Sequence, residues 1–375
     1  GCPGTQGQWA FMVMEYYRFT QDAEFLQSRY PELRRAMGYL HRMRAGLEKA
    51  EARLPVEERE RVEGLLPPGG GRTVRTYAEH YWALLGWKEL RTAASILGLD
   101  RDATWADDQY RALKASVRRS LRFRLDRSDV SWLPAVVEED GFDADSVALL
   151  FWPCEETDLV EPHELQSSLD RFYEQFLHRG EDGSAVHRPS TDARLLVPLS
   201  MMGRGDYARE VLYDLLAARK PRGWHGWADV AMEDPRKPGR AGFMPDLEAA
   251  ATYVTAVRGL AARESGGGLE LLSGAPSEWL QHGDGYRVFG MPTAYGPLDL
   301  HAYWHRDRLR VEIGGTARPP GGYRICWPRQ VAPERVMANG EALKDFDAVG
   351  VRLPHDFSGT VEAVFPYLAP WPRDP

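Results

Sequence analysis

The chain has 375 residues, 43% hydrophobic and 27% charged, so it can bury a large core and is not disordered as a whole. Its net charge of −8 argues against a general nucleic-acid binder, because such proteins need a basic surface. No stretch of about 18 apolar residues occurs, so we expect no membrane span. Cys2, Cys154 and Cys326 fit neither a zinc pattern nor a disulfide framework, so we expect idle or buried thiols and no cofactor.

The chain begins Gly1-Cys2-Pro3 and carries no initiator Met and no signal peptide. We interpret this start as processed or truncated, so it does not indicate a cellular compartment.

Apolar positions at helical spacing predict paired amphipathic helices over most of residues 6–264. Pro and Gly separate them, and Pro31 and Pro245 each suit the first turn of a helix. A Gly-rich loop over 64–71 lacks the Lys-Ser/Thr ending of a phosphate loop, which argues against a nucleotide site. The predicted helices are 6–19, 23–28, 31–50, 77–97, 101–125, 146–152, 162–178, 191–202, 206–218 and 245–263.

After residue 264 the hydrophobic pattern changes from helical to alternating, and we interpret residues 265–268 as a linker. Asn339-Gly340 predicts a β-hairpin. The predicted strands are 286–289, 298–304, 309–313, 322–327, 336–338, 349–353 and 360–365. We therefore predict a mainly α protein: an (α/α) helical-hairpin toroid or barrel over residues 1–264, followed by a small C-terminal β-sandwich over 268–375.

Several segments, in this order, resemble the bacterial six-hairpin glycosidase superfamily, most closely its α-L-rhamnosidase-like branch. They are QGQW (6–9), YPELRRA (30–36), YWALLG (81–86), AASILG (93–98), MGRGDYA (202–208), LSGAPSEWL (272–280) and PTAYG (292–296). The resemblance implies a helical barrel whose cleft takes a carbohydrate substrate.

The chain also departs from this family. The family's Asp/Arg/Glu-rich acid motif has no match here and would lie upstream of Gly1. Nine or ten helices are predicted, against the twelve of a full six-hairpin barrel. Phe243 and Asp246 stand where the family leads us to expect an acidic residue and a His.

Glycoside hydrolysis needs two carboxyl groups across the scissile bond. We predict Glu233 as the base, because it lies in a long loop (220–242) and matches the position of the family's loop base. Long loops in compact domains are usually functional, although Glu233 can also be read as a solvated carboxylate.

The predicted partner of Glu233 is Glu156, Glu79 or Asp246. Glu156 comes directly after Glu155, and the two residues follow a short apolar helix. Adjacent carboxylates raise each other's pKa. The alternative is that Glu155 and Glu156 cap the helix near residue 162. Glu79 opens the helix at 77–97, where it either faces the cleft or favours the helix N-terminus. Asp246 also sits at a helix start, which favours capping.

Sugar contacts are predicted for aromatic, His and acidic side chains near these carboxylates. They are Trp82, Trp152, Trp224 and Trp227 as stacking platforms, together with His80, Glu155 and His225. The scattered His residues predict no metal site, and the absence of Gly-x-Ser-x-Gly argues against a serine hydrolase.

These features together predict a glycosidase that uses paired carboxylates on a carbohydrate substrate. One alternative is a non-catalytic carbohydrate-binding protein that keeps the barrel and has lost the acid. The other is a polysaccharide lyase, in which His80 with Tyr81, or His225 with Arg222, would matter more than Glu233. The sequence indicates neither the sugar and its linkage nor the oligomeric state.

Overall fold

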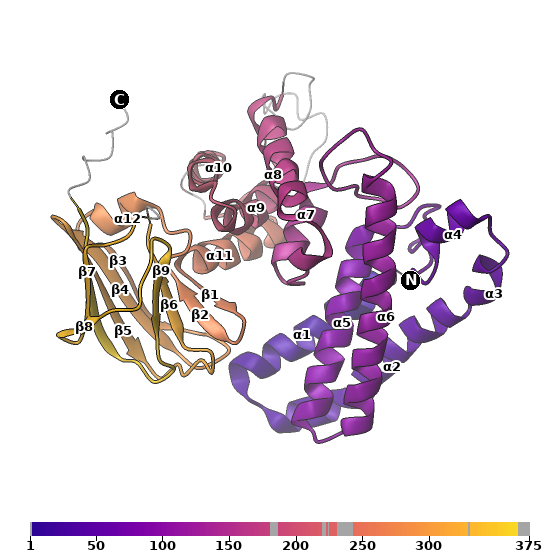
Figure 1. Cartoon of the computed structure of the whole chain (residues 1–375), viewed down its shortest axis with the longest axis horizontal. Helices are drawn as coiled ribbons and strands as arrows, with labels where there is room; N and C mark the ends of the chain where they lie inside the picture. The colour runs from indigo at the N-terminus through magenta and orange to yellow at the C-terminus, as the bar shows by residue number, and fades with distance from the viewer. Residues whose placement is uncertain are drawn as a thin grey trace. The chain divides into compact units, whose positions relative to one another are not determined.

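The computed structural model (Figure 1) describes residues 2–180, 187–219, 223, 225–230, 243–328 and 331–366. Contacts divide the chain into two compact units, Gly1–Gly183 and Ser184–Pro375. The first unit is built from helices, and the second combines helices with two β-sheets. The predicted domain boundary at residues 264–268 stays a prediction.

Helix α5 is the core of the first unit. It packs against α1 and α6 (Figure 1), and its side chains Tyr77, Tyr81 and Trp87 are fully buried. Its start is set by Thr76, whose hydroxyl accepts a hydrogen bond from the Glu79 N–H. The helices of this unit are α1 (Gly4–Thr20), α2 (Ala23–Ala45), α3 (Glu48–Glu51), α4 (Val56–Val62), α5 (Tyr77–Ile96), α6 (Asp100–Leu125), α7 (Ala144–Phe151) and α8 (Pro162–Leu177), with a 3₁₀ turn at Thr157–Leu159.

The predicted helix start at Pro31 is wrong, because α2 runs without a break from Ala23 and contains this proline. Asp22 is the residue that begins the helix, since its side chain accepts a hydrogen bond from the Phe25 N–H at 2.9 Å. Proline removes one hydrogen bond from a helix interior. Buried Tyr30 and Leu33 on either side offset that loss by packing into the core.

The second unit begins with α9 (Pro189–Met201), α10 (Gly205–Ala217) and α11 (Leu247–Ala261). One sheet has the order β1-β2-β6-β9 and the other the order β3-β4-β5-β10-β7-β8, with one apolar core in common. The strands are β1 (Ala262–Ser265), β2 (Gly268–Leu271), β3 (Tyr286–Met291), β4 (Leu298–His305), β5 (Arg308–Gly315), β6 (Tyr323–Cys326), β7 (Arg335–Ala338), β8 (Glu341–Leu343), β9 (Gly350–Leu353) and β10 (Gly359–Val364); the short helix α12 spans Ser277–Gln281.

The predicted linker at 265–268 is wrong, because this segment closes the β1–β2 hairpin. Ser265 pairs with Gly268, and Gly266 and Gly267 both have positive φ, as a two-residue hairpin turn requires. The hairpin predicted at Asn339-Gly340 is confirmed, since it joins β7 to β8 with φ values of 49° and 87°.

No helix in the described part of the chain is long and apolar enough to cross a membrane.

Candidate functional site

Helices α1 and α5 lie in direct backbone contact where three glycines meet the other helix. A Cβ on Gly7 would lie 1.8 Å from the carbonyl oxygen of Trp82, and one on Gly86 would lie 2.9 Å from the Gly7 Cα. A Cβ on Gly4 would lie 3.2 Å from the Glu79 Cα. The glycines therefore hold α1 against the part of α5 that carries Glu79 and Trp82.

Phe11, Trp82 and Trp152 form an aromatic cluster at one end of this contact. The Phe11 ring centroid lies 6.1 Å from that of Trp82 and 5.7 Å, edge to face, from that of Trp152. Trp152 is 45% exposed, whereas Phe11 and Trp82 are half-buried. An exposed indole on a fixed aromatic base is the arrangement that stacks on the apolar face of a sugar ring.

The structure thus brings together two predicted stacking residues through a third that sequence reasoning missed. Gly4, Gly7 and Phe11 follow one another at spacings of i, i+3 and i+7, so they share one face of α1. Small residues at that spacing indicate a close helix contact, and Phe11 continues the same face. This signal in the sequence could have identified Phe11.

Glu79 lies on α5 one turn before Trp82, and its side chain is only 9% exposed. Within the described part of the chain, neither carboxylate oxygen has a hydrogen-bond partner. The nearby charged group is the Arg72 guanidinium, whose Nη1 lies 3.8 Å from Oε1 of Glu79. The Arg72 side chain is itself 55% exposed. The carboxyl group therefore sits just beneath the surface, behind Arg72.

Burial raises the pKa of Glu79. The charge of Arg72 opposes that rise without cancelling it, as do the Cys2 thiol and the Gly69 backbone N–H, whose approach to the carboxylate falls short of hydrogen-bond geometry. Gly69 allows the close approach of its loop, since a Cβ there would lie 2.6 Å from Oε1 of Glu79. A carboxyl group whose pKa is raised by desolvation is the usual choice of general acid in glycoside hydrolysis.

His80 is buried, and backbone groups use both of its ring nitrogens. Nε2 accepts a hydrogen bond from the Leu66 N–H at 3.0 Å, and Nδ1 lies 2.7 Å from the Thr76 carbonyl, to which it donates. Burial lowers the pKa of His80 to about 4, so the ring is neutral near pH 7. His80 therefore ties the loop at Leu66 to α5, and this position argues against a contact with substrate.

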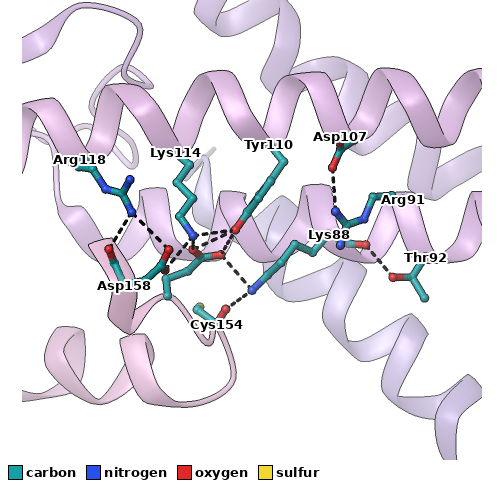
Figure 2. A network of polar contacts seen from close by, with 10 residues as sticks. Lys88, Arg91, Thr92, Asp107, Tyr110, Lys114, Arg118, Cys154 and Asp158 are labelled. Carbon is teal, nitrogen blue, oxygen red and sulfur yellow. Dashed lines mark hydrogen bonds and ion pairs between the residues drawn. The ribbon is translucent and has the colours of Figure 1, made fainter. Parts of the chain in front are cut away.

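Glu156 is fully buried, and its carboxylate takes part in a polar network with Lys88, Tyr110 and Lys114, which Figure 2 labels. Its two carboxylate oxygens lie 2.9 Å from Lys88 Nζ and 2.8 Å from Lys114 Nζ, and the Tyr110 hydroxyl donates to it at 3.0 Å. Figure 2 shows the side chains of Lys88, Tyr110 and Lys114 converging from α5 and α6. Glu156 joins both helices to the segment after α7, which argues against the predicted catalytic role.

The other predicted role of the Glu155-Glu156 pair, capping the helix near residue 162, is wrong. Glu161 and Glu164 form the capping box of α8. Glu155 is exposed and has a φ of 50°, a left-handed conformation that non-glycine residues rarely adopt. It remains a candidate for sugar contact because it follows Trp152 closely on the surface of the first unit.

Three predicted residues are described in the second unit. Trp227 is 5% exposed and its indole N–H donates to the Leu215 carbonyl at 2.7 Å, so it belongs to the core, and its burial argues against a stacking platform. Asp246 begins α11, because its side chain accepts a hydrogen bond from the Ala249 N–H at 2.7 Å. His225 is exposed. Glu233 and Trp224 lie outside the described residues.

Among the residues that the structure describes, no three His, Cys, Asp or Glu side chains come together to hold a metal ion.

No protein-family model matches the sequence, and no curated protein matches it either. Solved structures do match. The α-L-rhamnosidase of Dictyoglumus thermophilum matches with a TM-score of 0.54 over 96% of this chain, at 11% identity. The GH78 family rhamnosidase of Bacillus sp. GL1 matches with a TM-score of 0.51 over 86% of this chain, at 12% identity.

The chain spans only 39% and 33% of the length of those two proteins. At such low identity the likeness concerns the fold. It confirms the predicted fold class, helical hairpins of the (α/α) type followed by a C-terminal β-sandwich, and it places the chain beside the α-L-rhamnosidases in architecture.

Proposed function

We propose that this chain acts as a glycoside hydrolase in which the aromatic cluster binds the sugar and Glu79 is the general acid. The observation that carries the proposal is the buried carboxyl group of Glu79, which has no hydrogen-bond partner among the described residues and lies one turn from Trp82. The fold that the chain shares with two α-L-rhamnosidases supports a glycoside as the class of substrate.

In this proposal the protonated Glu79 gives its proton to the leaving-group oxygen of the glycoside. A second carboxylate then acts as base or nucleophile on the other side of the bond. Glu233, which lies outside the described residues, stays the prediction from the sequence for that role. The exposed ring of Trp152 supplies the stacking surface that holds the sugar in place.

Hydrolysis of aryl glycosides, with an aryl α-L-rhamnoside among them, tests the proposal. We expect Glu79→Gln to lower kcat by a factor of about 100 or more, the usual effect of losing a general acid, with little change in KM. Trp152→Ala should instead raise KM. The matched control is Glu89→Gln, because Glu89 is a buried carboxylate of the same helix that is already paired with Arg18. Equal turnover by the parent and Glu79→Gln would refute the assignment.

A carbohydrate-binding protein without turnover is the second candidate. It is favoured by the structural roles of Glu156 and Asp246, which reduce the number of free carboxylates on the described part of the fold. Such a protein would bind sugar through Trp152 and release no product in any form. The lyase alternative is weakened because His80 uses both ring nitrogens in backbone hydrogen bonds.

A further inference from the structure

The second unit contains a cavity of about 470 Å³ that is lined by residues separate from those proposed for catalysis. Its walls come from the α9–α10 turn, from residues 272–278 and from the segment after β6. Its volume lies within the range of about 300–1,000 Å³ that small-molecule sites occupy. Two segments with sequence likeness to the glycosidases, 202–208 and 272–280, both contribute to it, and the catalytic proposal gives them no role.

Part of the cavity wall is polar but balanced in charge. Arg209 Nη1 lies 2.9 Å from Glu278 Oε1, so the two charges compensate each other. The Ser273 and Ser277 side chains also line the cavity, and Ser277 is 7% exposed. Neither hydroxyl makes a hydrogen bond to another described residue, so both can pair with a ligand.

Another part of the cavity wall is apolar. Leu212, Leu260 and Leu272 are each at most 2% exposed and line the cavity. Gly274 keeps this wall close-packed, because a Cβ there would lie 2.4 Å from Leu260 Cδ2 and 2.8 Å from Ser200 Oγ. The cavity lining therefore combines hydroxyl groups and an ion pair with aliphatic side chains.

We propose that this cavity is a binding site for a neutral sugar, distinct in its residues from the Glu79 site. A pyranose ring has hydroxyl groups at its edge and C–H groups on its faces, and the cavity lining offers both polar and apolar partners for them. The ligand should not be an anion, because Arg209 is already neutralised by Glu278 and the exposed Asp206, which also lines the cavity, repels anions.

Calorimetric titration of the full chain with methyl α-L-rhamnoside, methyl glucoside and glucuronate tests this proposal in a Trp152→Ala background, which removes the stacking surface of the first unit. We expect the two neutral sugars to bind and glucuronate not to bind. Ser273→Trp should abolish this binding by filling the cavity, and Ser277→Ala should weaken it about fivefold through loss of one hydrogen bond.

The control is Thr316→Trp, which adds the same bulk at an exposed position outside the cavity. Thermal unfolding of each variant shows whether it is folded, and Ser277→Ala keeps the test valid if Ser273→Trp does not fold. Binding that survives Ser273→Trp, no binding of either neutral sugar, or equal binding of glucuronate would overturn the proposal. Because no outcome depends on turnover, failure of the hydrolase proposal would be seen separately.

Discussion

Gly7 of α1 lies so close to Trp82 of α5 that a Cβ on the glycine would be 1.8 Å from the Trp82 carbonyl oxygen. Such a contact cannot be relieved by a side-chain rotation, since the atom it meets is backbone. The position of α1 therefore requires a residue without a Cβ at Gly7. The same requirement holds Phe11 beside Trp82 and Trp152.

We expect Gly7→Ala to lower the free energy of unfolding by about 3 kcal/mol, the upper range for overpacking of a rigid core, because the helices must separate. Urea denaturation measures the loss. The control is Gly141→Ala, where a Cβ meets no atom within 4 Å and φ is not positive, so its stability should stay within about 0.5 kcal/mol of the parent. Equal stability of Gly7→Ala and the parent would show that the two helices do not meet as described.

The role of Glu156 is tested by Glu156→Gln. The amide cannot compensate the charges of Lys88 and Lys114, which approach from two helices, so we expect a loss of roughly 3 kcal/mol in the free energy of unfolding. Denaturant unfolding at neutral pH measures it.

Glu155→Gln is the control, because it makes the same chemical change at an exposed neighbour and should alter stability by less than about 0.5 kcal/mol. If Glu156→Gln instead abolished turnover without loss of stability, the result would support the catalytic role predicted from the sequence and contradict the structural role.

Local sequence patterns predict most of the helices and strands, because the periodicity of each depends on residues that are close together in the sequence. The departures have physical reasons. Pro31 was expected to begin a helix, but burial of Tyr30 and Leu33 outweighs the lost hydrogen bond and the helix continues. Strands β1 and β2 are absent from the prediction because each is only four residues long, and β1 follows α11 without a break.

The site was predictable only in part. Trp82 and Trp152 could be chosen as aromatics near helix ends, but nothing local shows that both meet Phe11. Glu156 looked like a cleft carboxylate because its partners, Lys88 and Lys114, come from helices distant in the sequence. Burial and ion pairing between distant segments are tertiary properties, so a pattern of residue types cannot separate a buried ion pair from a catalytic pair.

Glu79 should make the stability of the protein depend on pH. Its pKa is raised in the folded state by burial, so the folded form keeps a proton that the unfolded chain releases near its ordinary pKa of about 4.3. The contribution of Glu79 to stability is thus largest below that pH and falls as pH rises through the window up to the folded-state pKa.

Glu79→Gln removes this titration, because the amide stays neutral. We expect the variant to gain in Tm relative to the parent as the pH is raised from about 3 to 7, with the difference smallest at the acid end. Differential scanning calorimetry across this range measures it. Glu89→Gln, which removes a carboxylate paired with Arg18, should instead lose stability at pH 7. A Glu79→Gln difference in Tm that is constant with pH would mean that the carboxyl group is solvated rather than buried.

Asp246 is the residue for which a single pair of substitutions separates capping from catalysis. Its side chain accepts a hydrogen bond from the Ala249 N–H at 2.7 Å and so begins α11. Asparagine caps a helix as well as aspartate does, whereas alanine costs about 1 kcal/mol. We therefore expect Asp246→Asn to keep both stability and glycoside turnover, and Asp246→Ala to lower stability by that amount while kcat stays unchanged. Thermal unfolding and steady-state kinetics on the same preparations measure both. A catalytic carboxylate would give the opposite pattern, since Asp246→Asn would then lose turnover by orders of magnitude while the helix stayed capped.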